Sequence, residues 1–480
     1  MILINENVLK DKIYACWTGK NIGGTMGFPY EGQRELNDIQ GYSTPVGTVL
    51  PNDDLDLQLI WLKALEDRGA AAINEQLLGE YWLNYITPHW NEYGIGKNNL
   101  KLGLLPPLSG EYNNYWKHSN GAWIRSEIWA CITPGCPDAA IKLAYADACV
   151  DHGMGEGTYA ELFTASVQSA AFVIDDALSL IKIGLSKIPA DCRIAKSVNM
   201  VVDAYKKGTP WKETRELVLQ DSLKDLGWFQ APANVAYTML GLLYGEGDFK
   251  KSMILAINCG DDTDCTGATL GALLGIMYGT KAIPEDWRAH INDNIVTIAV
   301  DVGSYGGVAK TCTELSERVY NLVAQSLSLN HAEVAITSGE GTKDVKPEWF
   351  MNDYIANMIK DVPPYSNAFR SHFALITVDY GCEPVIKINE SFKITVSFLN
   401  RFQDPRYLQL RLIPPDSFDG ELSSSCVLLD HDTLDRAPTF SRVTITITAN
   451  EYIQPINRGV LEVTTAGKPG AMYIPIILLA

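Results

Sequence analysis

The chain has 480 residues, a length typical of two or three domains. Hydrophobic residues make up 46% of it and charged residues 20%, proportions that exclude a disordered or fibrous chain. The net charge of −18 argues against a general nucleic-acid binder, which needs a basic surface. We therefore expect no nucleic acid as a partner, whereas a phosphorylated small molecule is compatible with this charge.

The N-terminal sequence MILINENVLKDKIYACW has no basic segment followed by an apolar core, so we expect no signal peptide. The most apolar helical stretch, residues 268–278, is too short to span a membrane, which takes about 20 residues, and we expect no membrane partner. The cysteines are scattered and form no CxxC pair. This pattern predicts reduced thiols in a cytoplasmic protein without a structural zinc site.

Residues 1–330 have a helical pattern. Apolar residues recur at three- and four-residue spacing in residues 60–67, 139–148, 159–174 and 235–243. Gly and Pro interrupt these runs, and strands do not alternate with helices. We therefore predict a mainly α protein whose residues 1–330 form an all-α domain.

Residues 331–368 are predicted to connect this domain to a second one and to contain one short helix at 348–360. Beyond residue 369 the apolar period becomes two, which is typical of strands. The candidate strands are residues 373–380, 385–388, 392–399, 407–413, 442–448, 460–464 and 472–478. They predict an antiparallel β-sandwich over residues 369–480. This domain is interpreted as a packing module that could form a homo-oligomer, or as a carbohydrate-binding accessory.

The first acidic cluster is Asn52-Asp53-Asp54, which precedes the amphipathic residues 57–65. A single Asp or Asn at this place is explained by helix capping, because its side chain accepts hydrogen bonds from the free N–H groups of the first turn. Two adjacent carboxylates exceed that need, because like charges repel one another without a counter-ion.

The second acidic cluster is Asp261-Asp262-Thr263-Asp264-Cys265-Thr266, which also begins a predicted helix. That helix carries glycines at positions 267, 271, 275 and 279 on one face, and each Gly costs about 1 kcal/mol relative to Ala. The glycine stripe predicts that another segment packs very close to this helix. We expect the helix to be buried at the domain centre, with its acids at the edge of a cleft.

A divalent cation between the two clusters would compensate acids that are buried at a helix start. Asp, Asn and Thr oxygens suit Mg²⁺, Mn²⁺ or Ca²⁺ better than zinc. The alternation of Asp262 and Asp264 allows both carboxylates to reach one ion. The two clusters together therefore predict a site for one or two cations.

These clusters resemble the motifs of the ADP-ribosylglycohydrolase family, which includes the dinitrogenase reductase-activating glycohydrolases. Landmarks of the family follow in the right order over about residues 10–330, whereas the β-domain lies outside the resemblance. The landmarks are Gly23-Gly24-Thr25-Met26-Gly27-Phe28-Pro29-Tyr30-Glu31, Asn52-Asp53-Asp54, Asn120-Gly121-Ala122-Trp123-Ile124-Arg125, His152, Asp261-Asp262-Thr263-Asp264-Cys265 and Pro284-Glu285-Asp286-Trp287. The resemblance implies an all-α fold with a central cleft and a two-metal site, usually magnesium.

The resemblance also implies residue roles. It makes Asp53, Asp54, Asp262 and Asp264 metal ligands and places Glu31 at a mobile acid position over the substrate. Asn52 stands where the family has a ligand Thr, and its carbonyl oxygen can still bind a hard cation. Cys265 replaces a second ligand, and a thiol is a poor partner for magnesium. Thr266 would take that role if the register shifts by one residue, and Gly24 stands where the family often has Asp.

Residues outside the acidic clusters remain open to two interpretations. His152 and the following Gly153-Met154-Gly155-Glu156-Gly157 could cradle a phosphate at a helix N-terminus, or could be a core histidine and a flexible loop. Asn120, Gly121 and Arg125 are either substrate contacts or turn and surface residues. Glu31 is either a surface acid or, by the resemblance, a catalytic acid.

The leading functional hypothesis is metal-dependent hydrolysis of an ADP-ribosyl N- or O-linkage on a small-molecule or ADP-ribosylated substrate, with Glu31 or Asp54 assisting proton transfer. The first alternative is a glycoside hydrolase that uses the same cleft on another furanoside or a plain sugar, which the departures at Gly24 and Cys265 favour. The second is a non-catalytic binding protein with a degenerate site. The aligned aspartates argue against it, because clustered buried acids are costly.

Overall fold

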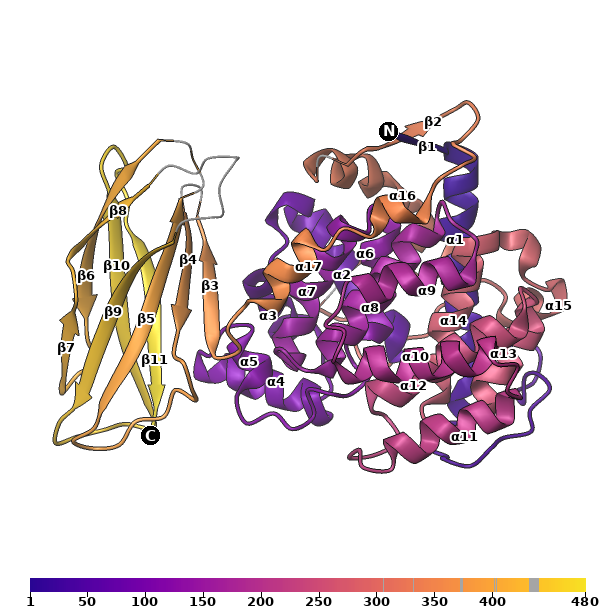
Figure 1. Ribbon diagram of the computed structural model, residues 1–480, viewed down its shortest axis with the longest axis horizontal. Coiled ribbons are helices and arrows are strands. Elements are labelled where there is room, and N and C mark those ends of the chain that lie inside the picture. The colour runs from indigo at the N-terminus through magenta and orange to yellow at the C-terminus, as the bar shows by residue number, and fades with distance from the viewer. Residues whose placement is uncertain (305, 331, 372–373, 401, 403, 431–439) are drawn as a thin grey trace. The chain divides into compact units, whose positions relative to one another are not determined.

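The structure is a computed structural model, which describes all residues except 305, 331, 372–373, 401, 403 and 431–439. The chain divides into two compact units. The first consists of Met1–Lys97 and Asn114–Asp361, and it is helical (Figure 1). The second consists of Asn98–Asn113 and Val362–Ala480, and strands dominate it. The strand-rich unit therefore includes a segment that lies within the sequence of the helical one.

The first unit contains a succession of helices and one short parallel strand pair, β1 (Ile2–Asn5) with β2 (Val334–Thr337). The α-helices are α1 (Glu6–Gly27), α2 (Asp53–Arg68), α3 (Glu75–Tyr85), α4 (Asn91–Leu102, which continues into the second unit), α6 (Glu127–Ile132), α7 (Pro137–His152), α8 (Glu156–Ala171), α9 (Ala177–Ser186), α10 (Arg193–Lys206), α11 (Trp211–Ser222), α12 (Ala231–Gly245), α13 (Phe249–Asn258), α14 (Thr263–Tyr278), α15 (Glu285–Ile291), α16 (Cys312–Leu329) and α17 (Tyr354–Lys360). Short 3₁₀ helices are η1 (Phe28–Tyr30), η2 (Ala70–Ala72), η3 (Trp123–Arg125), η4 (Thr280–Ala282) and η5 (Pro347–Phe350).

The helices predicted from apolar spacing are confirmed, because they correspond to α2, α7, α8 and α12. One prediction in the connecting segment is wrong. The single helix expected over residues 348–360 is two elements, η5 and α17, separated by residues 351–353. The apolar spacing continues across this break, so the period alone does not reveal it.

The centre of the helical unit is a backbone-to-backbone contact between α1 and α14. Added Cβ atoms on either helix would overlap backbone atoms of the other at Gly19 with Gly271, Gly23 with Gly267, Gly27 with Thr263, and Ala15 with Gly275. The predicted close approach is confirmed at Gly267, Gly271 and Gly275, whereas Gly279 has a φ of 74° and ends the helix. The residue numbers run in opposite directions, so the helices are antiparallel. The end of α1 therefore lies beside the acidic start of α14.

The described residues of the second unit form two antiparallel sheets. One has the strand order β11-β10-β6-β8 and the other the order β3-β4-β5-β9-β7. The strands are β3 (Ser366–Arg370), β4 (Ala374–Asp379), β5 (Ser391–Asn400), β6 (Arg406–Ile413), β7 (Phe418–Leu422), β8 (Cys426–Leu429), β9 (Phe440–Ala449), β10 (Ile456–Thr465) and β11 (Met472–Leu479). The predicted antiparallel β-sandwich is confirmed.

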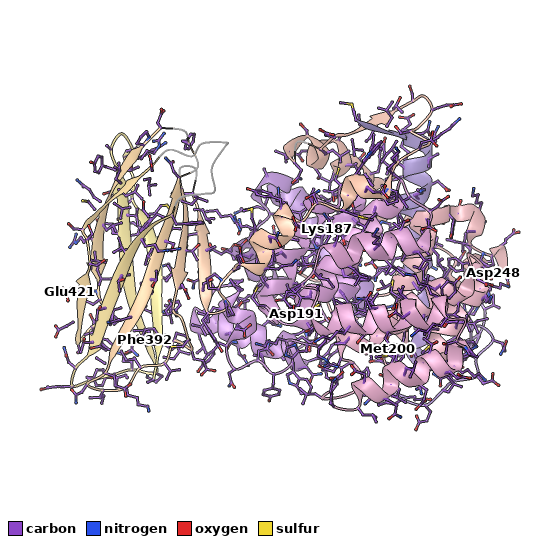
Figure 2. The ribbon with its side chains drawn as sticks, viewed as in Figure 1. Lys187, Asp191, Met200, Asp248, Phe392 and Glu421 are labelled. Atoms are coloured by element: carbon purple, nitrogen blue, oxygen red, sulfur yellow. The ribbon has the colours of Figure 1, made fainter. Side chains whose placement is uncertain are left out.

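Alternate residues of the sandwich strands form one hydrophobic core. In β5, Phe392, Ile394, Val396 and Phe398 are buried, and Figure 2 labels Phe392 on this strand. Residues from both sheets meet in this core, and Leu104 and Leu108 of the segment Asn98–Asn113, which also contains α5 (Leu108–Glu111), belong to it. The sandwich therefore completes its core with apolar residues that precede it by more than 250 positions.

The sequence prediction missed five of the described strands, namely β1 and β2 of the helical unit and β3, β7 and β8 of the sandwich, and one predicted strand is wrong. β3, β7 and β8 are short, and the pattern of β7 is interrupted by Gly420. Residues 385–388 form no strand and contribute one isolated bridge, from Val385 to Leu479. The first residue of the predicted strand 373–380, Phe373, lies outside the described residues. The core of the sandwich nevertheless follows the predicted two-residue period.

The cysteines are free thiols, as expected from their scattered positions. Among the described residues, no helix combines the length and the apolar character that crossing a membrane requires.

Candidate active site

Both acidic clusters lie at helix N-termini, as predicted. Asn52 caps α2, because its Oδ1 accepts a hydrogen bond of 2.8 Å from the backbone N–H of Asp54. At the start of α14, Asp262 occupies the cap position without a side-chain capping bond. Helix capping therefore explains Asn52 but does not explain Asp54 or Asp262.

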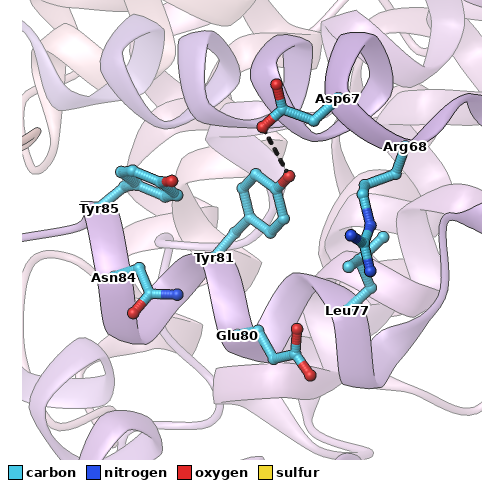
Figure 3. Close-up of a pocket in the computed structure, with 7 residues that line it drawn as sticks. All are labelled: Asp67, Arg68, Leu77, Glu80, Tyr81, Asn84 and Tyr85. Atoms are coloured by element: carbon cyan, nitrogen blue, oxygen red, sulfur yellow. Dashed lines mark hydrogen bonds between the residues drawn. The ribbon is translucent and has the colours of Figure 1, made fainter. Parts of the chain in front are cut away.

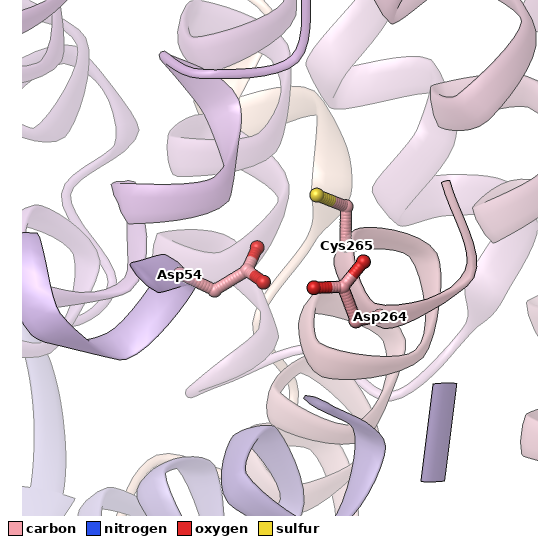
Figure 4. A group of neighbouring side chains, drawn as sticks. All are labelled: Asp54, Asp264 and Cys265. Atoms are coloured by element: carbon pink, nitrogen blue, oxygen red, sulfur yellow. The ribbon is translucent and has the colours of Figure 1, made fainter. Parts of the chain in front are cut away.

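The tertiary structure brings the two clusters together with Glu31. One carboxylate oxygen from each of Glu31, Asp262 and Asp264 lies within 4.8 Å of the others. The same limit holds among Asp54, Asp264 and the thiol of Cys265, and Figure 4 shows these three side chains directed toward one another. Asp264 belongs to both groups and lies at their common centre.

Several oxygens of this cluster have no hydrogen-bond partner. Both carboxylate oxygens of Asp54 and one oxygen each of Asp262 and Asp264 are buried and unpaired. Buried polar atoms in proteins almost always have a partner, and unpaired buried carboxylates are especially costly. A divalent cation would supply the missing partner for all three side chains, so the residues present fit a metal site of hard oxygen ligands.

The electrostatics of the cluster support the same interpretation. Burial, together with the charge of Asp264, raises the pKa of Asp54 and of Asp262 well above the usual carboxyl range. Partial desolvation and the neighbouring carboxylates raise the pKa of Glu31 to about 8, and burial raises that of Asp53 to about 6. These raised pKa values favour the protonated forms in the absence of a cation, whereas a bound cation would favour the ionised forms.

Glu31 differs from the other acids because its side chain is exposed. The loop that carries it pairs with the start of the second cluster: Gly32 N–H donates to the carbonyl of Asp261, and Asp261 N–H donates to the carbonyl of Gln33. The guanidinium of Arg34 donates to both carboxylate oxygens of Asp261. These contacts hold Glu31 at the exposed rim of the cluster.

Asp53 and Thr266 are less central than their neighbours. Asp53 is partly buried and accepts a hydrogen bond of 3.2 Å from the Tyr93 hydroxyl. The Thr266 hydroxyl donates to the carbonyl of Thr263 in its own helix at 3.2 Å. Cys265, rather than Thr266, lies in the group with Asp54 and Asp264.

Asn120 lies in the site, where its side chain binds Asp262. Its amide donates to Asp262 Oδ2 at 2.7 Å, and its carbonyl oxygen accepts from the Trp123 indole at 2.8 Å. Asn234 holds the same acid from the backbone side, because its Oδ1 accepts from the N–H of Asp262. Both polar ends of the Asn120 side chain are therefore engaged within the protein, which makes it a positioning residue for Asp262.

We expect Asn120→Ala to weaken cation binding by about 10–100-fold, the usual effect of removing a group that orients a metal ligand. The measurement is the Mg²⁺ concentration that gives half of the maximal rise in melting temperature. Asn114→Ala is the matched control, because the Asn114 amide is equally buried and donates to the carbonyl of Asp151 instead. An equal change in both variants would show that Asn120 acts only on stability.

The glycine-rich turn near His152 has its backbone donors occupied. The N–H groups of Gly155, Glu156, Gly157 and Thr158 donate to the His152 carbonyl, His118 Nδ1, the Lys117 carbonyl and the Gly155 carbonyl, respectively. A phosphate at this helix start would have to displace these partners. These four donors are therefore not free to bind a phosphate in this structure.

The glycines of this region have packing roles. Gly153 has a φ of 52° at the end of α7. An added Cβ at Gly155 would overlap the Lys117 carbonyl, and one at Gly121 would overlap the Glu92 carboxylate. His152 is fully buried, with Nε2 3.1 Å from the Ser119 hydroxyl and Nδ1 3.0 Å from Asp151. The core-histidine alternative accounts for these contacts.

Arg125 is a buried structural cation. Its guanidinium forms ion pairs with Asp147 at 2.8 Å and with Asp151 at 2.7 Å, and it donates to the carbonyl of Gly121. This network fixes the segment that carries Asn120. Through Asn120, the network supports the position of Asp262.

Sequence reasoning missed Lys20, a fully buried lysine on α1. Its ammonium pairs with Glu127 at 3.1 Å and donates to the carbonyl of Ile124. It is also close enough to Asp54 to oppose the rise in the pKa of that acid. The sequence does contain a signal for it, because Lys20 stands beside the glycines of α1 that pack closely, and a charge at such a place requires a buried partner.

A separate cavity of about 430 Å³ lies near the other end of α2. It is lined by Asp67, Arg68, Leu77, Glu80, Tyr81, Asn84 and Tyr85 (Figure 3). The rise of about 1.5 Å per helical residue places this end of α2 roughly 20 Å from Asp54. The cavity is therefore distinct from the acidic cluster.

Comparison with known proteins gives an extensive match to one family model. The sequence model of the family described as ADP-ribosylglycohydrolase matches residues 5–326. Among solved structures, an ADP-ribosylglycohydrolase-related protein complex is 19% identical, covers 66% of this chain and 99% of its own, and has a TM-score of 0.45. No curated protein matches the chain.

Two further solved structures cover a smaller part of the chain. The GAE domain of yeast GGA1 is 12% identical, covers 24% of this chain and 99% of its own, and has a TM-score of 0.18. The GAE domain of GGA2p from Saccharomyces cerevisiae is 14% identical, covers 24% of this chain and 96% of its own, and has a TM-score of 0.16. None of the structural similarities is strong enough to support a functional argument.

Proposed function

Because the chain belongs to the ADP-ribosylglycohydrolase family, we propose that it is a metal-dependent hydrolase that cleaves an ADP-ribosyl N- or O-glycosidic bond. Membership supports a hydrolase, and the substrate and the binuclear magnesium-type site are our proposal. The observation that carries it is the convergence of Glu31, Asp54, Asp262 and Asp264, with buried oxygens that lack protein partners. Mn²⁺ and Ca²⁺ are alternatives to Mg²⁺.

Asp54, Asp262 and Asp264 would hold the cation, with Asp53 and Asn52 at the edge of the site. A bound divalent cation supplies an electrophile that polarises a water or a ribose hydroxyl. Asp54 is fully buried and neither of its oxygens has a hydrogen-bond partner in the protein, so we assign one oxygen to the cation and the other to accepting a proton from an attacking water. Asn120 and Asn234 keep Asp262 in position from two sides.

Glu31 is the acid that a substrate would meet first. Its exposed carboxyl group adjoins the buried acids, and the pairing of its loop with Asp261 fixes its distance from them. We assign it proton transfer to the leaving group of the glycosidic bond. In this proposal Glu31, at the rim of the site, protonates the leaving group, and Asp54, at its base, accepts a proton from the attacking water.

A second candidate is a glycoside hydrolase that acts on another furanoside or a plain sugar. The observation that favours it concerns Gly24, which stands where the family often has Asp. A Cβ added at Gly24 would overlap the amide nitrogen of Asn52. Asn52 therefore fills space that an acidic side chain at position 24 would need. A site altered in this way could accept a different sugar while keeping the same acids.

The test is hydrolysis of ADP-ribosylated protein, ADP-ribose conjugates and aryl glycosides, each with Mg²⁺, with Mn²⁺ or with EDTA. We expect release of product from an ADP-ribosyl substrate that requires a cation. Cation binding is measured separately as a rise in melting temperature, because a ligand that binds the native state stabilises it.

The outcomes of this test are distinct. Cleavage of aryl glycosides alone would favour the second candidate. A cation-dependent rise in melting temperature without any product would favour a binding protein. A melting temperature that does not change with millimolar Mg²⁺, Mn²⁺ or Ca²⁺ would contradict the metal site itself.

A further inference from the structure

The thiol of Cys265 lies inside the cluster of buried carboxylates. Its Sγ and one oxygen from each of Asp54 and Asp264 are all within 4.8 Å of one another. Cys265 is 6% exposed, Asp264 3% and Asp54 0%. Figure 4 shows that the thiol comes from the first turn of α14 and faces the carboxylate that α2 contributes.

The carboxylates around this thiol independently indicate a ligand. Both oxygens of Asp54 and Oδ1 of Asp264 are buried without a hydrogen-bond partner. The nearby buried ammonium of Lys20 is already paired with Glu127, at 3.1 Å. A cation placed among the three side chains would therefore contact two unpaired carboxylates and one sulfur atom.

Sulfur changes which cation such a site prefers. Mg²⁺ binds oxygen ligands almost exclusively, whereas Zn²⁺ and Cd²⁺ bind thiolates strongly and accept carboxylates as well. Bonds of about 2.0–2.3 Å at the tetrahedral angle hold two ligands of one Zn²⁺ roughly 3.3–3.6 Å apart. The three side chains lie within 4.8 Å of one another, so on binding they draw closer by up to roughly 1.5 Å.

We propose that Cys265 is a metal ligand and that the chain binds a thiophilic divalent cation, of the Zn²⁺ or Cd²⁺ type, more tightly than Mg²⁺. On binding, the thiol releases its proton to solvent and Sγ donates an electron pair to the cation. The inference rests on the cation site of the proposed function and is independent of the substrate and of the reaction. It assigns a softer cation than Mg²⁺ to the position among Asp54, Asp264 and Cys265 and leaves the rest of the proposed site unchanged.

Cys265 has one competing role within the protein. The thiol also lies within hydrogen-bonding range of Asp262. If the only role of Cys265 were to donate a hydrogen bond to Asp262, serine would perform that role at least as well, because a hydroxyl is a better donor than a thiol. Replacement by Ser therefore separates the two roles.

The experiment is a titration of the full chain with Cd²⁺, followed by the ultraviolet charge-transfer absorption of a cadmium–thiolate bond. All variants also carry Cys382→Ser and Cys426→Ser, because these two thiols are exposed and would add background. We expect the band to appear in the otherwise wild-type chain and to be absent from Cys265→Ser. Calorimetry with Cd²⁺, Zn²⁺ and Mg²⁺ measures the affinities.

We expect Cys265→Ser to lower Cd²⁺ affinity by at least about 10-fold, because losing a group that only orients a metal ligand already costs about that much. The affinity for Mg²⁺ should stay the same or rise. Cys259→Ser is the matched control. Cys259 is also buried, six positions earlier, and its thiol donates to the carbonyl of Leu255 in its own helix. This control should retain the band and the affinity.

A band that persists in Cys265→Ser, or Mg²⁺ affinity equal to that for Cd²⁺ in the wild-type chain, would overturn the proposal. If Cys265→Ser does not fold, the cadmium NMR chemical shift of the wild-type chain shows whether sulfur binds the ion, because sulfur and oxygen ligands give different shifts. A shift typical of oxygen ligands alone would overturn the proposal. Mg²⁺ binding without a thiolate signal would refute this inference and leave the proposed function intact. Failure of every cation to bind would refute both.

Discussion

Replacement of Asp264 by Asn should abolish both cation binding and hydrolysis. Asp264 belongs to both groups of converging side chains, the one with Glu31 and Asp262 and the one with Asp54 and Cys265. Asn keeps the volume and the hydrogen-bonding capacity but removes the charge that a cation needs. The loss of turnover should exceed the roughly 100-fold effect of removing a group that only orients a ligand.

The measurements for Asp264→Asn are turnover on the substrate that the panel identifies and the cation-dependent rise in melting temperature. Asp56→Asn is the matched control, because Asp56 lies on the same helix as Asp54 and is equally buried. One Asp56 oxygen accepts from the backbone N–H groups of Ile298 and Ala299, at 2.6 and 2.7 Å, so its role is to hold a loop. Asp56→Asn should lose stability and retain cation binding.

Two results would contradict the assignment of Asp264. One is a wild-type response to Mg²⁺ and wild-type turnover in Asp264→Asn. The other is an equal loss in Asp264→Asn and Asp56→Asn, because it would show that any buried acid near the start of these helices matters only for folding.

Gly271→Ala should destabilise the helical unit by about 3 kcal/mol. This is the upper end of the usual cost of overpacking a core, which is about 1–3 kcal/mol. The added Cβ would overlap the carbonyl carbon and oxygen of Gly19. These are backbone atoms of a helix, so no side chain can rotate away to make room. The two helices must separate instead, and Gly271→Val should fail to fold.

Separation of α1 and α14 should also weaken cation binding, because the end of α1 leads into Glu31 and the start of α14 carries Asp262 and Asp264. The measurement is the urea midpoint of unfolding, with and without Mg²⁺. Gly306→Ala is the control, because no heavy atom of the described residues, apart from its chain neighbours, lies within 4 Å of a Cβ at that position. An unchanged midpoint in Gly271→Ala would show that the helices tolerate a wider spacing.

Local patterns in the sequence were sufficient for much of the fold. The three- to four-residue period located α2, α7, α8 and α12, and the two-residue period located most strands of the sandwich. The glycine spacing after Thr266 predicted a close helix contact, because repeated glycines on one face are costly unless a backbone approaches. These features depend on residues near one another in the chain.

The local patterns failed where local and long-range forces compete. The short strands β7 and β8 lack a long alternating run, so pairing with β9 and β6 determines them. Leu104 and Leu108 flank Pro106-Pro107 in a segment without a strand-like period, yet they complete the core of the sandwich. A local period cannot identify such partners, because it reports only which residues are apolar and how they are spaced.

The sequence by itself determined that two acidic helix starts, at Asn52-Asp53-Asp54 and at Asp262, would need a counter-charge, because adjacent carboxylates repel one another at any position in a fold. Only the tertiary structure decided that Cys265 joins Asp54 and Asp264, and that Asn120 holds Asp262. It also placed Lys20 beside Glu127. The reason is the antiparallel contact of α1 with α14, because backbone-to-backbone packing fixes which helix ends meet, and therefore which distant side chains share one site.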